Sequence, residues 1–384
     1  MKENFPCDIR QLPTPSLLLE REVMRANIQR MAERMGALNC NLRPHVKTHK
    51  SLQVLADVEK GGNTAGITVS TLQEAEYFFE GGYSNILYGV GLTPNKVEAV
   101  ANLISRGCSL TVVTDNIAAI NLLGERARVL GIELPVLIEL DVDGHRSGVP
   151  PMGEELIDVA RAIQETSGLT LQGVMTHAGG SYDCDSIDDI RHCAQQERDL
   201  AVSAAQAIRA EGLSCQVVSI GSTPTALMSN NLDGVTEIRP GVYTFLDLFQ
   251  VGLGVAQLSD IAISVLTTVI GHQEEKGWVI VDAGWMAMSR DRGTEKQRLD
   301  QGYGVVCDLE GEPLMDVIMG KANQEHGIIM VRNGAAPLKP CDFPVGTMLR
   351  ILPNHACATS GQYEHYCVLE GSSCTNFWRR TRGW

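Results

Sequence analysis

Apolar and polar positions follow two different patterns along this chain, and the change between them lies near residue 250. From residue 20 to about 250, short runs rich in β-branched residues alternate with longer segments of helical periodicity. Residues 21–37, for example, place Val23, Ile28 and Met31 at helical spacing and end near a glycine. Eight strands are predicted in this part, at residues 41–47, 66–70, 85–90, 110–115, 135–143, 171–179, 215–223 and 235–241.

Several of these predicted strands are continuous apolar runs and do not alternate. Such runs are typical of parallel strands that helices cover on their outer side. Eight β/α units within residues 20–250 predict an α/β fold, a (β/α)₈ TIM-type barrel. In that fold the chemistry takes place in the loops that follow the carboxyl ends of the strands.

The pattern after residue 250 is β-rich, with few helical stretches. We therefore expect a barrel domain at residues 20–250 and a separate, mostly-β domain at residues 251–384. The segment SLLLE at residues 16–20 could add a strand to the second domain, so residues 1–19 are assigned to it.

Composition narrows the class of protein. There are 46 acidic and 32 basic residues, a net charge of −14, and the absence of any Lys/Arg run argues against a nucleic-acid or membrane partner. No apolar run approaches the ~20 residues of a membrane span, and the N-terminus lacks the apolar core of a signal peptide. Eleven cysteines without paired spacing favour a reduced compartment. We expect a soluble cytoplasmic protein. Proteins with these properties are most often enzymes.

Lys47 ends the first predicted strand. At that position it would point into the mouth of the barrel, where burial lowers a lysine pKa and makes the amine nucleophilic. Taken alone, the pattern also fits a solvated lysine beside Lys50.

Further candidate residues lie at or just after the ends of four of the later strands. They are Arg146 after the fifth strand, His177 and Tyr182 at and after the end of the sixth, Ser222 and Thr223 at the end of the seventh, and Arg239, Gly241, Val242 and Tyr243 at and after the end of the eighth. Hydroxyls and glycine amides after the last two strands are where such barrels commonly hold a phosphate. Each loop alone is most simply a turn, but together with a reactive amine the set suits pyridoxal phosphate bound as a Schiff base.

A second candidate site lies in the β-rich part, at His355 and Cys357. On a strand, residues i and i+2 face the same way, so the imidazole and the thiolate could share one metal ion, with zinc favoured. Two protein ligands would leave positions open for water and substrate, although such triplets are commonly incidental. His326 lies in the polar segment 323–327, which is either a turn or a contact to metal or substrate.

A family resemblance rests on seven segments that occur in the same order along nearly the whole chain. They are RPHVKTHKS, DGHRSG, THAGGSY, GSTPT, TEIRPGVY, QEHG and PNHACAT. In these segments the chain resembles the D-threonine aldolase and D-serine dehydratase family, whose members have the alanine-racemase-like fold, pyridoxal phosphate fold type III. The resemblance also implies a homodimer.

The resemblance implies a role for each candidate residue. Lys47 corresponds to the Schiff-base lysine, Arg146 to the arginine directed at the phenolic oxygen, and His177, with Tyr182 close by, to the histidine packed on the pyridine ring. The remaining cofactor contacts are Ser222, Thr223, Gly241 and Val242 at the phosphate, Arg239 at the pyridine nitrogen, and Tyr243 beside them. His355 and Cys357 match the metal pair of the dehydratases, whereas the aldolases tend to carry His-x-Asp there. Unlike the racemases, the chain offers no clear second-base tyrosine.

The implied activity is that of a lyase that uses pyridoxal phosphate and a divalent metal: zinc, or else manganese or cobalt. It would convert a 3-hydroxy D-amino acid, 3-hydroxyaspartate or D-serine, to a 2-oxo acid and ammonia, with Lys47 moving the α-proton. The alternative is an aldolase that releases glycine and an aldehyde, with His326 as base. A non-catalytic cofactor carrier and a cofactor-free Schiff-base aldolase also stay open. The cations that could bind a second substrate carboxylate are Arg146, Arg290, Arg292 and Lys321.

Overall fold

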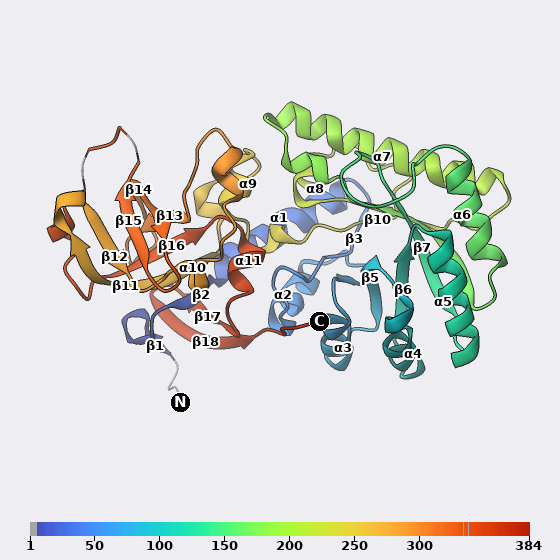
Figure 1. Ribbon diagram of the computed structural model, residues 1–384, viewed down its shortest axis with the longest axis horizontal. Helices are drawn as coiled ribbons and strands as arrows, with labels where there is room; N and C mark the ends of the chain where they lie inside the picture. Colours follow the sequence, from blue (N-terminus) through green and yellow to red (C-terminus); the bar gives the residue numbers. More distant parts are fainter. Residues whose placement is uncertain (1–5, 333, 337) are drawn as a thin grey trace. The chain divides into compact units, whose positions relative to one another are not determined.

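The fold is described from a computed structural model, for residues 6–332, 334–336 and 338–384. The chain forms two compact units (Figure 1). The parallel unit comprises Gln29–Gly241 with Thr381–Trp384, and the antiparallel unit comprises the chain up to Ile28 with Val242–Arg380. The predicted domain boundaries at residues 20 and 250 stay a prediction.

The parallel unit contains an eight-stranded sheet in the order β3-β10-β9-β8-β7-β6-β5-β4, in which every pairing is parallel. Its strands are β3 (Asn41–Leu42), β4 (Ile67–Val69), β5 (Asn85–Gly91), β6 (Ser109–Thr114), β7 (Leu134–Leu140), β8 (Leu169–Thr176), β9 (Val217–Ile220) and β10 (Glu237–Ile238). All eight predicted strands are therefore present. The parallel α/β architecture expected from the apolar runs is confirmed as a TIM-like sheet.

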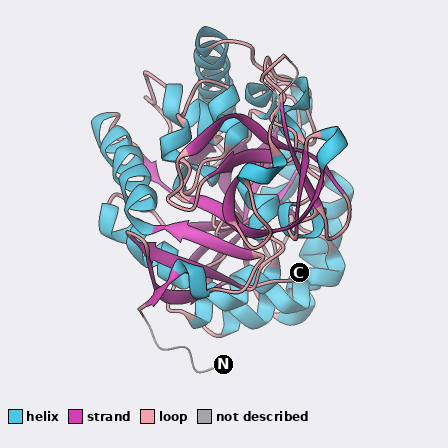
Figure 2. Ribbon diagram, turned by 90° about the vertical axis from the view of Figure 1, so that its left-hand side faces the viewer, coloured by secondary structure: helices cyan, strands magenta, loops and turns pink. Residues whose placement is uncertain are grey.

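Figure 2 draws the helices of the molecule in cyan and its strands in magenta. Helices precede or connect the strands of the parallel sheet along the chain. They are α1 (Arg21–Ala37), α2 (Leu52–Gly61), α3 (Leu72–Glu80), α4 (Val97–Ser105), α5 (Ile117–Leu130), α6 (Glu154–Glu165), α7 (Ile187–Ala210) and α8 (Thr223–Met228), with the 3₁₀ turns η2 (Pro94–Lys96) and η3 (Gly179–Tyr182). The helix predicted at residues 21–37 is confirmed.

The strands that come first and last along the chain in this sheet, β3 and β10, are shorter than predicted, at two residues each. Pro44 and Pro240 lack the N–H that a strand needs to continue its ladder. The segment after β3 nevertheless stays next to the segment after β10, because the His45 amide donates to the Pro240 carbonyl oxygen at 2.9 Å. Two parallel bridges, Leu42 with Thr64 and His45 with Thr68, join the β3 segment to the β4 side. The polar residues that follow β3 are thereby held between the two ends of the sheet.

The antiparallel unit contains a ten-stranded sheet in the order β1-β18-β17-β2-β11-β12-β15-β14-β13-β16, and its one parallel pairing is β17 with β2. An additional pairing of β11 with β16 closes part of it into a β-barrel. The strands are β1 (Cys7–Asp8), β2 (Ser16–Glu20), β11 (Ile263–Gln273), β12 (Trp278–Val281), β13 (Gly304–Cys307), β14 (Pro313–Ala322), β15 (Gly327–Val331), β16 (Met348–Pro353), β17 (His365–Glu370) and β18 (Ser373–Arg379).

Short helices and turns interrupt this sheet, and two of them carry candidate residues. The helices are α9 (Leu248–Gly252), α10 (Trp285–Met288) and α11 (Ala356–Ser360), and the 3₁₀ turns are η1 (Ile9–Gln11), η4 (Val242–Thr244), η5 (Leu258–Asp260), η6 (Glu274–Lys276), η7 (Gly293–Lys296) and η8 (Pro340–Asp342). Val269, Val281 and Ile329 are fully buried within one apolar cluster of the sheet. This core fixes the strands from which the α10 and α11 segments emerge.

Candidate active site

Lys47 lies in the turn that follows β3, and its side chain is exposed. The expectation that burial would activate this lysine is therefore wrong. Lys50 differs from it, because its Nζ lies 2.9 Å from the carboxylate of the fully buried Glu74. Among the described residues, Lys47 has neither a hydrogen-bond nor an ion-pair partner. Lys47 is thus an open amine without a counter-ion, whereas Lys50 is part of the framework.

His177 follows β8 and lies in the electrostatic field of Lys47. Burial and the Lys47 charge lower the pKa of His177 to about 3, so its imidazole is neutral at physiological pH. Its Nδ1 lies 3.3 Å from the Gly221 carbonyl oxygen. The ring centroids of His177 and Tyr182 are 6.2 Å apart, with the planes tilted by 41°. The structure thus brings His177 within electrostatic range of Lys47 and close to the Tyr182 ring, although β3 and β8 are not neighbours in the sheet.

A second histidine in this region, His45, was not a candidate. Burial, Lys47 and Arg239 lower its pKa well below the usual value. Its Nδ1 is buried and has no hydrogen-bond partner among the described residues. A neutral imidazole with an unused nitrogen beside the open lysine can accept or donate a hydrogen bond to a bound group.

Buried hydroxyls gather at the start of α8. Ser222 caps this helix, with its Oγ 3.0 Å from Ser181 Oγ and 3.1 Å from Thr225 Oγ1. Thr223 is the next residue and is also buried. Gly221, with φ +112°, precedes them and packs so closely on Ile238 that a Cβ would lie 2.4 Å from the side chain. This tight turn gathers the hydroxyls of Ser222, Thr223 and Thr225 in one place, which suits an anionic group.

Arg239 is buried beneath the same loops, with 5% exposure. Its guanidinium donates to Ser219 Oγ at 2.7 Å and to the Thr176 carbonyl oxygen at 2.5 Å. Burial lowers the pKa of Arg239, while the carboxylates of Glu237 and Glu197 favour its charged form. A fixed positive charge therefore lies below the Lys47 region.

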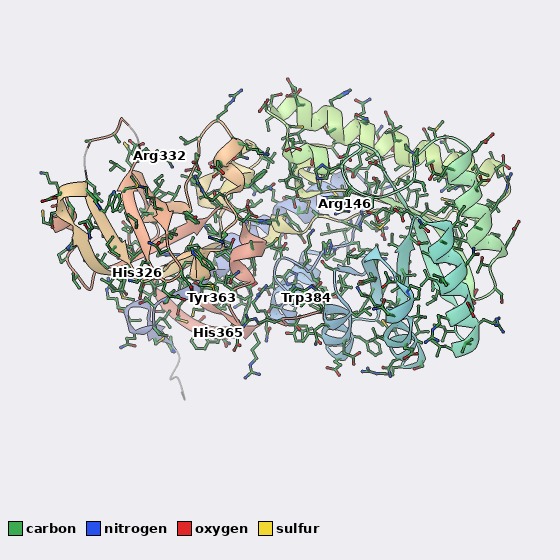
Figure 3. All side chains as sticks on the ribbon, viewed as in Figure 1. Arg146, His326, Arg332, Tyr363, His365 and Trp384 are labelled. Carbon is green, nitrogen blue, oxygen red and sulfur yellow. The ribbon has the colours of Figure 1, made fainter. Side chains whose placement is uncertain are left out.

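Arg146 and Gly241 complete the parallel unit's candidates. Arg146 follows β7, is labelled in Figure 3, and pairs with Glu139 at 3.1 Å while half of its side chain stays exposed. Gly241 lies against the Lys47 turn, where a Cβ would come within 3.0 Å of the His45 carbonyl oxygen. Val242 and Tyr243 lie in η4 of the antiparallel unit, and both are buried.

Glu197 was missed by the sequence analysis. It lies on α7 with 1% exposure, and its Oε1 accepts the Ala178 amide at 2.9 Å and the Gly221 amide at 3.0 Å. Burial raises the pKa of this carboxyl. It therefore ties together the two loops that carry His177 and Ser222. The sequence feature that could have identified Glu197 is its position on the apolar face of α7, at helical spacing from Ile190 and Ala201.

In the antiparallel unit, the structure places His355 and Cys357 next to each other but not on a strand. β16 ends at Pro353, His355 is the residue that caps α11, and Cys357 lies inside that helix. The predicted strand geometry is thus wrong, because the chain turns into a helix directly after the proline. The two side chains interact through this helical turn instead.

Anionic groups surround His355. Its Nδ1 lies 2.6 Å from Asp291 Oδ2. Burial disfavours the charged imidazole, but Cys357, Asp291 and the buried Asp247 outweigh it and raise the pKa of His355 to about 11. Asp247 in turn accepts the Ala356 amide at 2.8 Å. Such a set favours a cation, although no group of three or more His, Cys, Asp or Glu side chains in the described chain forms a complete metal site.

His326 is exposed, in the turn between β14 and β15 (Figure 3). This turn packs on the start of α10, since the Trp285 amide donates to the Asn323 carbonyl at 2.9 Å. No described contact joins the His326 side chain to His355 or Cys357. His326 therefore lies in the same unit as His355 and Cys357, but no described contact links it to them.

Among the described residues, no helix has both the length and the apolar character of a membrane span.

Comparison with known proteins finds two family models. Residues 19–248 match "Alanine racemase, N-terminal domain", and residues 262–369 match "Putative serine dehydratase domain".

Two curated relatives and one solved structure are similar over their whole lengths. The chain is 48% identical to D-threo-3-hydroxyaspartate dehydratase of Delftia sp. (strain HT23), covering 97% of this chain and 98% of that one. It is 32% identical to D-serine dehydratase of Dictyostelium discoideum, covering 97% of each chain. The solved structure of the Delftia enzyme superposes with a TM-score of 0.96 over 98% of this chain and 100% of that chain. Variants of that enzyme with a histidine or a cysteine changed to alanine, two positions apart, are also known, the cysteine variant in a metal-free form.

A third relative carries a different activity. The chain is 27% identical to 3-hydroxy-D-aspartate aldolase of Paracoccus denitrificans (strain Pd 1222), covering 97% of this chain and 92% of that one.

Proposed function

Because the chain belongs to the D-threonine aldolase and D-serine dehydratase family of alanine-racemase-like enzymes, as its motifs predicted, we propose that it is a dehydratase of 3-hydroxy D-amino acids. The substrate is D-threo-3-hydroxyaspartate or D-serine, and the products are ammonia with oxaloacetate or pyruvate. The observation that carries the proposal is the imidazole–thiolate pair of His355 and Cys357 in its anionic surroundings.

The parallel unit fits pyridoxal phosphate. An open amine at Lys47, the neutral His177 and His45, buried hydroxyls and the fixed charge of Arg239 form a cation-rich region that suits an anionic aldehyde cofactor. Lys47 would hold it covalently, with His177 and Tyr182 at the ring and Arg146 and Arg239 at its phenolic oxygen and nitrogen. Ser222, Thr223, Gly241 and Val242 would hold the phosphate, with Tyr243 beside them.

When bound, the cofactor supplies an electron sink for the charge that develops at the substrate's α-carbon. The chain itself moves the proton: the Lys47 amine, once free, takes it from the α-carbon. Glu197 keeps the His177 and Ser222 loops in place during this exchange, because it accepts one amide from each. His177 remains neutral, so at the cofactor ring it would act as an uncharged packing and hydrogen-bonding group.

The antiparallel unit fits a divalent cation, with zinc proposed first and manganese or cobalt as alternatives. The Asp291 carboxylate occupies His355 Nδ1, which leaves Nε2 as the metal-binding nitrogen. Cys357 supplies a thiolate, and the histidine and cysteine that are changed in the Delftia variants have the same spacing. When bound, the metal helps the β-hydroxyl to leave, as metals lower the pKa of bound water from 15.7 to about 7–9. His326, exposed on its hairpin, is proposed as an acid or base near the substrate.

The finer architecture is proposed on the same premise. The bridges Leu42–Thr64 and His45–Thr68 support a closed (β/α)₈ barrel of fold type III. We assign cofactor binding to residues 20–250 and metal binding to residues 251–384 with 1–19. The chain would act as a homodimer, and its eleven cysteines, which form no disulfide within the described part of the chain, support a cytoplasmic location.

Product analysis tests the proposal directly. The protein loaded with cofactor and metal is incubated with D-threo-3-hydroxyaspartate, D-serine or D-threonine, with and without chelator. Release of ammonia and a 2-oxo acid that stops with chelator supports the dehydratase. Release of glycine and an aldehyde would instead establish the aldolase, the activity named for the Paracoccus relative.

A further inference from the structure

We propose that Arg290 recognises the side-chain carboxylate of a dicarboxylic substrate, so that this chain prefers 3-hydroxyaspartate to D-serine. The inference rests on the proposed function. It identifies which of the two proposed substrates the loops around His355 and Cys357 would select. It follows from the juxtaposition of an unpaired guanidinium with the loop that supports His355.

The segment from Met288 to Thr294 is fastened to the His355 segment at three points. Asp291 bonds His355 at 2.6 Å, Thr294 donates to Asn354 Oδ1 at 2.7 Å, and Thr359 donates to the Met288 carbonyl oxygen at 2.6 Å. These contacts come from both ends and the middle of the segment. The backbone of this segment is therefore held in place beside His355.

The backbone of this segment is itself constrained. Ser289 has φ +79°, a conformation that residues other than glycine rarely adopt, and its amide donates to the Trp285 carbonyl at 2.8 Å. Its Oγ accepts the Asp291 amide at 2.9 Å. Strained positions of this kind are retained mainly where a neighbouring side chain must be held in one direction. The residues directly after Ser289 are Arg290 and the His355 partner Asp291.

Arg290 carries a positive charge that the described chain does not neutralise. The side chain is exposed, and its Cζ lies 4.7 Å from the centroid of the Trp285 ring. It has no hydrogen-bond or ion-pair partner among the described residues. The stack on Trp285 restrains the guanidinium while its N–H donors remain unused.

The other candidate cations are either paired with a carboxylate or stacked on a different aromatic ring. Arg292 is paired with Asp300 at 2.7 Å and Glu295 at 3.5 Å, and Arg146 is paired with Glu139. Lys321 lies on β14, where it stacks on Trp278. Arg290 is thus the one of the four candidates that is unpaired and adjacent to the residue supporting His355.

The chemistry of the substrate explains why this position matters. In 3-hydroxyaspartate the hydroxyl and the second carboxylate are attached to the same β-carbon. A hydroxyl bound at the metal would therefore place the second carboxylate next to the metal as well. A guanidinium presents two parallel N–H donors that match a carboxylate. D-Serine has a hydrogen in place of the carboxylate and gains nothing from Arg290.

The test compares R290M, R290K and the wild type with R298M, a matched control that removes another exposed arginine from the same stretch of chain. The first readout is the ratio of kcat/KM for D-threo-3-hydroxyaspartate to that for D-serine. The second is calorimetric binding of D-aspartate and D-alanine to the metal-loaded holoenzyme, which requires no turnover. We expect R290M to lower the kcat/KM ratio about 100-fold, with D-serine changed less than about threefold.

The binding readout should move in the same direction. R290M should weaken D-aspartate binding about 30-fold and leave D-alanine unchanged, R290K should fall between R290M and the wild type, and R298M should match the wild type. A wild type without preference for the dicarboxylic substrate, or an R290M or R290K protein that melts normally and keeps the wild-type ratio, would overturn the proposal. Absence of 2-oxo acid from either substrate would refute the proposed function alone, since the binding comparison still reports on Arg290.

Discussion

Two histidines, His177 in the parallel unit and His355 in the antiparallel unit, occupy opposite electrostatic surroundings. Around His177 the nearby charges are cations, and burial together with Lys47 lowers its pKa to about 3. Around His355 the nearby charges are anions, and despite burial they raise its pKa to about 11. The first region is prepared for an anion and the second for a cation. The same side chain thus serves a phosphate-bearing cofactor in one unit and a metal in the other.

The net charge of the protein is −14, which has the same sign as the charges around His355 and the opposite sign to those around His177. The cationic region depends on a few residues that the fold collects, chiefly the buried Arg239 and the unpaired Lys47. The anionic region combines Cys357, which is two residues from His355, with Asp291, which is 64 residues from it along the chain. The following experiments perturb one region while the other is monitored.

The largest effect is expected from Lys47→Arg. This change retains the charge but removes the nucleophilic amine, so we expect 2-oxo acid production to fall at least about 10⁴-fold. Borohydride reduction should no longer fix the cofactor to the chain, whereas metal content should stay normal. Lys50→Arg is the matched control, because it keeps the ion pair with Glu74 and should retain activity within a few-fold. A borohydride label that persists in the Lys47 variant would place the covalent link elsewhere.

Cys357→Ala should act on the other region alone. We expect a loss of bound metal and a fall in kcat of about 10³-fold, with the cofactor's absorbance spectrum unchanged. Metal content is measured by elemental analysis of the purified protein. The control is Cys341→Ala, which removes an exposed cysteine of the same unit. A Cys357 variant that keeps full metal and full activity would show that the pair is incidental.

Asp291→Asn should weaken the metal site without destroying it. The carboxylate orients His355 through Nδ1, and loss of such a partner typically lowers metal affinity 10–100-fold. Titration with buffered metal measures the shift, and activity should return at saturating metal. Glu295→Gln changes another exposed carboxylate nearby and should leave the affinity unchanged. Equal affinities for both variants would contradict the orienting role.

The smallest effect concerns the pH dependence of stability. Because the folded pKa of His177 is depressed to about 3, the unfolded chain binds more protons between about pH 6.5 and 3, and stability is lost as the pH falls through that window. From pH 7 to 5 this one group should cost at most ~2 kcal/mol. Urea unfolding of the cofactor-free protein measures it, and His177→Gln should lose correspondingly less than the wild type.

The exposed His192 provides the control for that measurement, since His192→Gln should leave the pH dependence as it is. If the His177 and His192 variants respond to pH alike, the imidazole at position 177 is not held neutral by the fold.

The sequence predicted the parallel unit well because its signals are local. Apolar runs such as that of β7 are buried along almost their whole length, and each candidate residue follows its own strand. Prediction failed where a proline changed the local geometry. Pro44 shortened the first strand and left Lys47 exposed beyond it, and Pro353 ended β16 before His355.

Two supporting carboxylates escaped prediction for a different reason. Glu197 lies in a helix rich in charged residues, and only its place on the buried face distinguishes it. Asp291 has no local signal, because its partner His355 is 64 residues away. Neither role could be inferred without knowing which distant segments the fold packs together.

By itself, the sequence determined the order and approximate positions of most strands and helices, which polar groups lie near the strand ends of the parallel unit, and to which family the chain belongs. These properties depend on periodicity and on residues close together along the chain. The tertiary structure alone decided that Lys47 has no counter-ion, that His177 and His355 bind protons so differently, and that Arg290 is unpaired beside the support of His355. Proton affinity and charge pairing depend on burial and on distances through space, which only the folded chain sets.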